Sequence, residues 1–272
     1  HRGRCDAGKN TRTTPMKKQR AFHCLVDVGN THTHLGWHDG DQWVGEAILK
    51  TSSLCQGELA EMQAAWKSQP KPTWAAFCSV VPQAGHVISA WLDVQDLTEG
   101  YEQLTHETIT GITVDYPQPE TIGADRLANA MAAAHLYGAP SVVVDFGTAL
   151  TFDVVNDQKA YVGGIIAPGI SLMTDYFHEK TALLPKITVA DPNAIIGKST
   201  TQAMQIGAVH GYRGLVASLI DALKQEMNIR RLPVIATGGY AALITQEMKA
   251  ITAQCPQLTL EGLRLLHPLR HA

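Results

Sequence analysis

The chain has 272 residues, of which 45% are hydrophobic and 17% charged, and its formal net charge is −3 at pH 7. This length allows one large domain or two of ordinary size, and the apolar content is typical of a packed α/β protein. The slight acidity and the lack of a basic run in the body of the chain argue against a nucleic-acid partner, and no apolar stretch is long enough to predict a membrane span.

The first twenty residues are expected to lie outside the fold. Residues 1–15 lack periodicity and precede Met16, which is typical of a tag, a cloning remnant or a misassigned start. The five cysteines are scattered and form no Cys-Xaa-Xaa-Cys pair. This pattern favours reduced thiols and therefore a cytoplasmic location.

The first half of the chain, residues 21–118, predicts a three-stranded meander followed by alternating helices and strands. The expected strands lie at 23–29, 33–37, 43–49 and 74–81. Ser53 and Gln56 form a candidate capping box before an amphipathic helix, and Pro82 suits the first turn of the next helix. A short strand at 111–116 and a Pro-rich crossing then mark the candidate domain boundary.

The second half, residues 119–272, repeats this order after an Ala-rich helix expected at 125–137. The expected strands lie at 142–146, 150–155, 161–166 and 233–237. A long helical region is predicted at about 200–227, and two more helices follow the last strand. The apolar stripe from Met204 to Leu223 along the long helix predicts either core packing or a subunit contact.

Two Asp-Xaa-Gly motifs each end a β-branched apolar run. Asp-Val-Gly-Asn-Thr occupies 27–31, and Asp-Phe-Gly-Thr occupies 145–148. In each motif the Gly lets the backbone turn tightly, so that peptide N–H groups and the Thr hydroxyl can face an anion. The carboxylate would hold a cation or water that accompanies a phosphate. The pair therefore predicts a nucleotide bound between two related halves.

Three segments of the chain allow more than one interpretation. Residues 29–31 could form an ordinary Asn-containing hairpin turn. Gly-Lys-Ser-Thr at 197–200 imitates the end of a Walker A loop, but Pro192 stands where that loop needs Gly, and no strand leads into it. His32, His34 and His38 could suggest zinc, yet no Cys or carboxylate lies at ligand spacing, so a phosphate role is favoured for this segment.

Motifs along nearly the whole chain resemble the type III pantothenate kinase family, within the acetate and sugar kinase, Hsp70 and actin superfamily. They are Gly-Ala-Asp-Arg at 123–126, Asp-Phe-Gly-Thr-Ala-Leu-Thr at 145–151, Gly-Gly-Ile-Ile-Ala-Pro-Gly at 163–169 and Thr-Gly-Gly at 237–239. The resemblance implies an α/β fold of two related actin-like (ribonuclease H-like) βββαβαβα domains with an ATP cleft between them. It implies ATP-dependent phosphorylation of pantothenate to 4′-phosphopantothenate, the first step of coenzyme A biosynthesis.

The resemblance also implies roles for individual residues. Asp125 is expected to accept the hydroxyl proton, and Asp145 to hold a monovalent cation, K⁺ or NH₄⁺. The expected ATP and phosphate contacts are Asp27, Val28, Gly29, Asn30, Thr31, His32, Thr33, His34 and Thr148. The expected pantothenate contacts are Tyr116, Gly123, Ala124, Asp125, Arg126 and Thr181. From helix chemistry alone, Asp125 could simply interact with the helix dipole.

The resemblance further implies Mg²⁺ with ATP and a homodimer whose interface completes the substrate pocket. Two rival functions stay open: another kinase of the superfamily that acts on a sugar or short acid, and a non-catalytic regulatory protein of the Bvg accessory type. The Gly-Ala-Asp-Arg turn with Tyr116 upstream argues against the first rival. Asp125, both loops and Thr181 together argue against the second, because a non-catalytic protein has no physical need for the combination.

Overall fold

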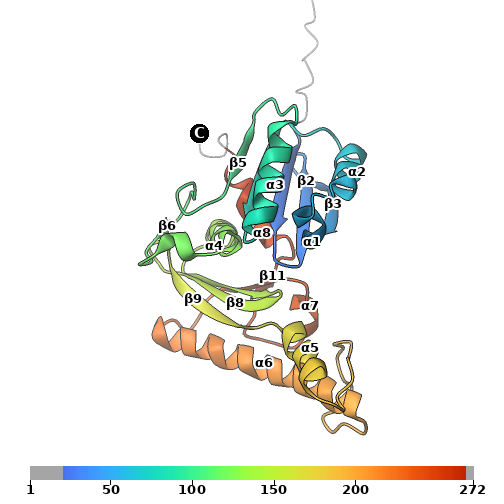
Figure 1. The fold of residues 1–272 in the computed structure, drawn as a ribbon. Helices are drawn as coiled ribbons and strands as arrows, with labels where there is room; N and C mark the ends of the chain where they lie inside the picture. The colour runs from blue at the N-terminus through green and yellow to red at the C-terminus, as the bar shows by residue number, and fades with distance from the viewer. Residues whose placement is uncertain (1–20, 268–272) are drawn as a thin grey trace, which may run out of the picture.

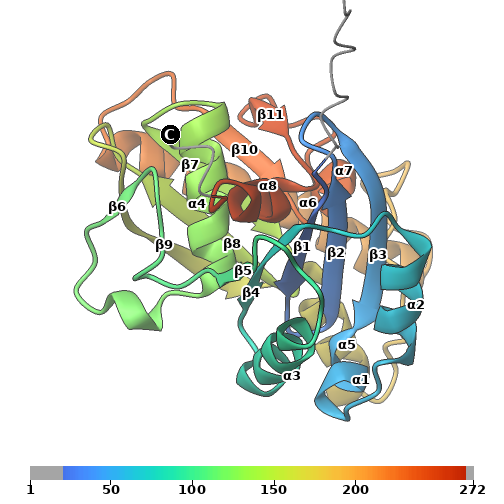
Figure 2. The same cartoon turned by 90° about the horizontal axis from the view of Figure 1, so that it is seen from above.

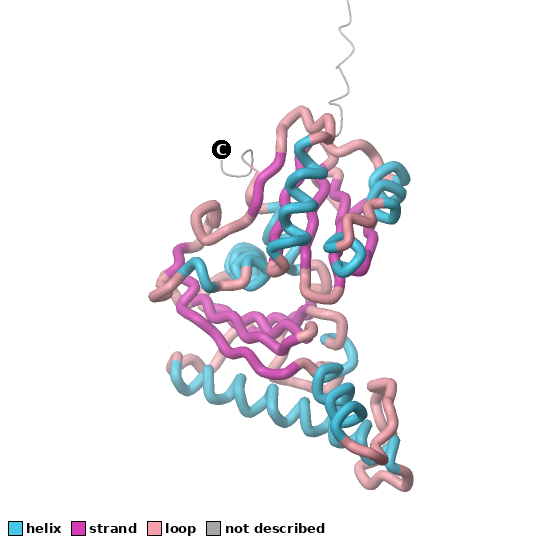
Figure 3. The backbone as a smooth tube through the Cα atoms, viewed as in Figure 1, coloured by secondary structure: helices cyan, strands magenta, loops and turns pink. Residues whose placement is uncertain are grey.

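The computed structural model describes residues 21–267, so the predicted tag at 1–20 lies outside the described residues. Two mixed β-sheets lie one above the other, with helices between them and on their outer faces (Figure 1). The tube view in Figure 3 shows the same layers by secondary structure. Within the described range, no helix is long and apolar enough to cross a membrane.

The first sheet has the strand order β3-β2-β1-β4-β5. Its strands are β1 (His23–Val28), β2 (His32–His38), β3 (Trp43–Lys50), β4 (Trp74–Ser79) and β5 (Tyr101–Gln103). One face is covered by α1 (Thr51–Cys55), α2 (Ala60–Ser68) and α3 (Pro82–Asp93). Side chains at alternate positions of β1, such as Val26, pack against Ile88 and Trp91 of α3, as the two-residue period of a strand requires.

The second sheet has the strand order β11-β10-β7-β8-β9-β6. Its strands are β6 (Thr113–Val114), β7 (Ser141–Phe146), β8 (Ala149–Val155), β9 (Ala160–Pro168), β10 (Val234–Thr237) and β11 (Ala253–Gln254). The remaining helices are η1 (Pro119–Thr121), α4 (Ala124–Leu136), α5 (Ile170–Lys180), α6 (Thr200–Glu226), α7 (Ala241–Ile244) and α8 (Leu258–Arg264). Figure 1 shows α6 running along the outer face of this sheet.

The two sheets share one topology. The order β3-β2-β1-β4-β5 corresponds strand for strand to β9-β8-β7-β10-β11. In both sheets the first strand pairs antiparallel with the second and parallel with the fourth. The predicted α/β fold of two related halves is therefore confirmed, and Asp27 and Asp145 occupy equivalent positions, one residue before the end of β1 and β7.

Helices α4 and α8 form a layer between the sheets, where they lie side by side (Figure 2). Leu127 and Met131 of α4 pack against the first sheet, and Ala132 and Ala133 pack against the second. The small Ala side chains let both sheets come close to α4. Gly262 lets α8 approach α4 closely, because a Cβ at that position would collide with the carbonyl of Ala128 in α4.

Some local expectations differ from the structure. The predicted capping box is wrong: Ser53 lies inside α1, and α2 begins after Leu59 without a side-chain cap. The short strand β6, in the predicted first half, pairs with β9 of the second sheet, while α8 at the other end of the chain packs on β1. The domain boundary after residue 118 stays a prediction.

The apolar stripe of α6 serves mainly as core. Val209, Val216 and Ile220 are completely buried under the second sheet, together with Tyr212. Of the stripe, only Leu215 is exposed, at 36%. The side of this helix that carries apolar residues is thus used for packing within the chain.

Candidate active site

The two Asp-Xaa-Gly loops meet. The hydroxyl oxygens of Thr31 and Thr148 lie 3.1 Å apart, although 117 residues separate them in the chain. Both threonines are exposed. The first loop is closed by a hydrogen bond from the Gly29 amide to the His32 carbonyl, 3.0 Å long. Behind the second loop, Gly169 lies so close to the Thr148 carbonyl that a Cβ would not fit.

The carboxylates of Asp27 and Asp145 lie behind these loops and are only partly exposed. Burial, followed by the negative charge of Asp125, raises the pKa of Asp27 to about 7, and Cys78 lowers it by donating from Sγ to Oδ1 over 3.4 Å. Burial and Asp125 likewise raise the pKa of Asp145 to about 6, against a hydrogen bond of 3.2 Å from Asn129. The three carboxylates therefore repel one another.

This charge arrangement fits a bound cation. The donors to Asp27 and Asp145 are a thiol and an amide, and no Lys or Arg of residues 21–267 forms an ion pair with either carboxylate. Carboxylate oxygens are the ligands that Mg²⁺ and other hard cations prefer. An added cation would relieve the repulsion that, after burial, raises the pKa values of both carboxylates.

Asp125 lies in the first turn of α4, after the N-cap Gly123. Its Oδ1 accepts a hydrogen bond of 2.7 Å from the Arg126 amide, so it interacts with the N-terminal end of the helix, as the alternative interpretation expects. Burial nevertheless raises its pKa, and the Arg126 amide and charge only partly oppose that effect. A carboxylate with a raised pKa is a stronger proton acceptor, so the contact with the helix end does not prevent a catalytic role.

Arg126 is held in place by a buried acid that the sequence analysis missed. Its Nε donates to Asp153 Oδ1 over 2.6 Å, and its Nη2 donates to the Phe152 carbonyl over 3.0 Å. Tyr161 also donates to Asp153 Oδ1, over 3.3 Å, while Oδ2 has no partner among the described residues. Burial raises the pKa of Asp153 to about 7, although Arg126 lowers it. An Asp inside an apolar strand was the available signal.

Tyr116 joins the Arg126 group from the segment after β6. Its ring centroid lies 6.2 Å from that of Tyr161, whose ring in turn lies 5.9 Å from the guanidinium carbon of Arg126. Thr181 stands apart: its hydroxyl donates to the Phe177 carbonyl over 2.7 Å at the end of α5, and no described contact connects it with Asp125. The predicted pantothenate contacts gather at the start of α4, with the exception of Thr181.

Two of the predicted phosphate contacts have side chains that point into the core. Val28 is completely buried in the first sheet, and the buried Thr33 hydroxyl lies 3.0 Å from that of Thr51. Both residues can offer only backbone groups to a ligand. Asn30, His32 and His34 are exposed on the same hairpin.

The interpretation of this hairpin as a zinc site gains no support. The His32 and His34 rings lie 6.4 Å apart and are perpendicular. Across residues 21–267, the one set of three side chains with metal-ligand geometry lies elsewhere.

A second missed contact orients Asp145. Thr259 of α8 donates to Asn129 Oδ1 over 2.9 Å, which turns the amide nitrogen of Asn129 toward Asp145. On the other side, Gly238 has a φ of +90°, and a Cβ there would strike the Asp145 carboxylate. The Thr-Gly-Gly turn after β10 therefore needs Gly at this position.

Two sheets of one topology, with a carboxylate-glycine loop at the end of each first strand and the two loops in contact, are the arrangement of the actin-like superfamily. The chain belongs to the type III pantothenate kinase family, whose model matches residues 24–222. The type III pantothenate kinase of Akkermansia muciniphila is 42% identical over 244 residues, which cover 89% of this chain and 97% of the relative.

Solved structures support the fold. A Sinorhizobium meliloti protein assigned as a 2-dehydro-3-deoxygalactonokinase has a TM-score of 0.58 at 12% identity and covers 90% of this chain and 95% of its own. A Campylobacter jejuni protein assigned to the Baf family of transcriptional activators has a TM-score of 0.57 at 18% identity, with 89% and 96% covered. At these identities the likeness concerns the fold alone.

Proposed function

We propose that this protein transfers the γ-phosphate of ATP to pantothenate and so forms 4′-phosphopantothenate, the first step of coenzyme A biosynthesis. The observation that carries the proposal is the contact of the two loops at Thr31 and Thr148, beside the carboxylates of Asp27, Asp125 and Asp145. Membership of the type III pantothenate kinase family supports the choice of substrate. The described cysteines form no disulfide with one another, which suits a cytoplasmic enzyme.

Each residue of the site has its own role in the proposed reaction. The two loops face the phosphates with backbone N–H groups and the hydroxyls of Thr31 and Thr148. Asp125 accepts the proton of the attacking hydroxyl, and its raised pKa makes it a better base. Arg126, held by Asp153, presents its remaining Nη1 donors to the substrate carboxylate. Asp27 and Asp145 would hold Mg²⁺ and a monovalent cation, which supply charge neutralisation for the triphosphate.

Two other functions remain to be distinguished. A kinase for a sugar or short acid is compatible with the fold, since the Sinorhizobium meliloti protein of similar fold is assigned as a 2-dehydro-3-deoxygalactonokinase. A regulatory role without turnover is favoured only by the likeness to the Campylobacter jejuni protein. The Arg126–Asp153 pair favours pantothenate over a neutral sugar, because a fixed guanidinium recognises a carboxylate.

A substrate panel tests the proposal. The purified protein is incubated with Mg²⁺-ATP and KCl, and ADP release is measured with pantothenate, with a set of sugars and with a set of short acids. We expect ADP release that depends on pantothenate alone. Release with a sugar or short acid only would support the first rival, and release with none of them would support the second.

Asp145→Asn is expected to flatten the response of the enzyme to potassium, because the amide removes the charge that would hold the ion. The KCl concentration for half-maximal activity should rise about 10–100-fold, the loss expected for one charged contact. Activity is measured against KCl and NH₄Cl at fixed ionic strength with NaCl, and the exposed Asp157→Asn serves as control. Equal activity of the wild-type protein in sodium alone would remove the cation from Asp145.

We propose a homodimer formed through β9, α5 and the segment after α5. Large apolar side chains are exposed there, namely Ile166, Leu172, Tyr176, Phe177, Leu183, Ile195 and Ile196. A group of exposed apolar side chains on one surface is typical of a protein interface. Thr181 lies within this surface, so a two-fold contact could carry it to the partner's site. The apolar stripe of α6 offers less exposed surface to a partner subunit, because most of it packs within the chain.

Leu183→Glu is therefore expected to dissociate the dimer and to lower kinase activity. Leu183 is 90% exposed, so the substitution should leave the fold of the single chain intact. Val94→Glu is the matched control, since Val94 is 77% exposed at the end of α3, outside the proposed interface. Light scattering across a dilution series, together with the kinase assay, gives the result. A fully active monomer would show that one chain completes the pocket.

A further inference from the structure

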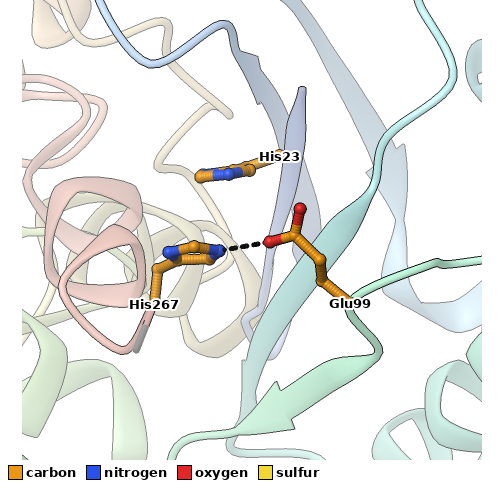
Figure 4. Close-up of side chains that lie close together, drawn as sticks. All are labelled: His23, Glu99 and His267. Atoms are coloured by element: carbon orange, nitrogen blue, oxygen red, sulfur yellow. Dashed lines mark hydrogen bonds and ion pairs between the residues drawn. The ribbon is translucent and has the colours of Figure 1, made fainter. Parts of the chain in front are cut away.

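A group of potential metal ligands lies at the start of β1, the opposite end from Asp27. His23 is the first residue of β1, Glu99 precedes β5, and His267 follows α8. One ligand atom from each lies within 4.8 Å of the other two (Figure 4). The three residues come from distant parts of the chain, and none belongs to the kinase site. Asp27 is four residues along β1, about 13 Å away.

The polar atoms of this group are incompletely satisfied. His267 Nε2 lies 2.8 Å from Glu99 Oε2, but His23 Nδ1 is buried without a hydrogen-bond partner among the described residues. The His23 and His267 side chains are about 95% buried, and their rings stack with centroids 4.4 Å apart. A buried polar atom without a partner is costly, so one that persists calls for a ligand.

The surroundings of the group suit a cation. The two imidazoles and the carboxylate supply one ligand atom each. Glu99 supplies a carboxylate, and its side chain is 39% exposed, which gives an ion a path from solvent. Trp74 contacts both imidazole rings edge-on and closes the apolar side.

We infer that His23, Glu99 and His267 form a binding site for a divalent transition-metal ion of the zinc class, with water as a fourth ligand. Two imidazole nitrogens and one carboxylate oxygen are a common zinc donor set. Zinc ligands at about 2.1 Å from the ion are about 3.4 Å from one another. The 2.8 Å contact between His267 Nε2 and Glu99 Oε2 must therefore widen, and the three ligand atoms, which lie within 4.8 Å of one another, must rearrange around the ion. The His23 ring must also turn about its Cβ–Cγ bond, because stacked rings direct their lone pairs past each other.

An ion at this position would join three segments. It would connect the start of the first sheet, the turn before β5 and the chain after α8. Since α8 also packs against α4, the ion would connect the α4–α8 layer, which carries Asp125, to the first sheet. Such a site stabilises the folded state without taking part in phosphate transfer.

The test uses the full-length protein without an affinity tag, and ZnCl₂ alone as the probe. Zinc binding is measured by calorimetry, and the unfolding temperature is measured with and without zinc, for the wild type, His23→Gln and Glu99→Gln. His106→Gln is the matched control, because His106 faces Glu107 at 4.0 Å on the surface. Glu99→Gln changes an exposed side chain and keeps the test decisive if His23→Gln does not fold.

We expect the wild type and His106→Gln to bind one zinc per chain and to gain about 4 °C or more in unfolding temperature. His23→Gln and Glu99→Gln should bind zinc at least about tenfold more weakly and lose most of that gain. No zinc binding by the wild type would overturn the inference. Unchanged binding in Glu99→Gln would also overturn it, since zinc would then be bound elsewhere.

Discussion

Asp125→Asn is expected to reduce the turnover number by about 10²–10⁴-fold, the usual contribution of a general base. The amide keeps the size of the side chain, and its oxygen can still accept the hydrogen bond from the Arg126 amide. It cannot accept the proton of the attacking hydroxyl. The start of α4 should therefore keep its geometry, while the chemical step loses its base.

The measurement combines kcat from ADP release with ATP affinity from calorimetry and with thermal unfolding. We expect ATP affinity and the unfolding temperature to change little, since Asp125 is not a phosphate contact. Asp157→Asn, on an exposed turn, should behave as the wild type in all three. A near-wild-type kcat in Asp125→Asn would remove this residue from the mechanism and leave it with its contact to the helix end alone.

Asp153→Ala should have the largest effect on folding. Asp153 is completely buried, and its partner Arg126 is 14% exposed, so the substitution leaves a buried guanidinium without its counter-ion. Removal of one partner of a buried ion pair costs about 3–5 kcal/mol. The free energy of unfolding, measured with urea, should fall by that amount, and the KM for pantothenate should rise because Arg126 loses its orientation.

Asp153→Asn separates the two effects. Its oxygen can still accept from Arg126 Nε, so we expect part of the lost stability to return together with part of the pantothenate affinity. Asp157→Ala controls for the loss of a negative charge in the same hairpin. If Asp153→Ala unfolds at the same urea concentration as the wild type, the pair contributes nothing to stability.

Strong local signals in the sequence predicted most of the fold. The two strand-Asp-Xaa-Gly motifs stand at equivalent places in two sheets of one topology, and the meander strands lie close to the predicted positions. These signals predicted the strands correctly because an apolar strand followed by a Gly turn depends little on distant contacts. The predicted cap at Ser53 was wrong because it depended on where a short helix starts. Helix α1 begins earlier, at Thr51, so Ser53 lies inside it.

The parts of the candidate site that the sequence did not predict depend on contacts between distant segments. Asn129 looks unremarkable in the sequence, and the only signal for Asp153 is its place inside an apolar strand. Each gains its role from a partner more than fifteen residues away. The two-residue strand β6 pairs with β9, which no local pattern can indicate. The position of α4 between the sheets also follows from packing on both its faces, although its Ala content was visible.

The most direct test of the account is identification of the product. The protein is incubated with Mg²⁺-ATP, KCl and pantothenate, and the mixture is analysed by mass spectrometry beside a reaction with Asp125→Asn. We expect 4′-phosphopantothenate in amounts equal to the ADP formed, and almost none with the variant. ADP without phosphopantothenate, or equal product from Asp125→Asn, would contradict the claim that this site phosphorylates pantothenate through Asp125.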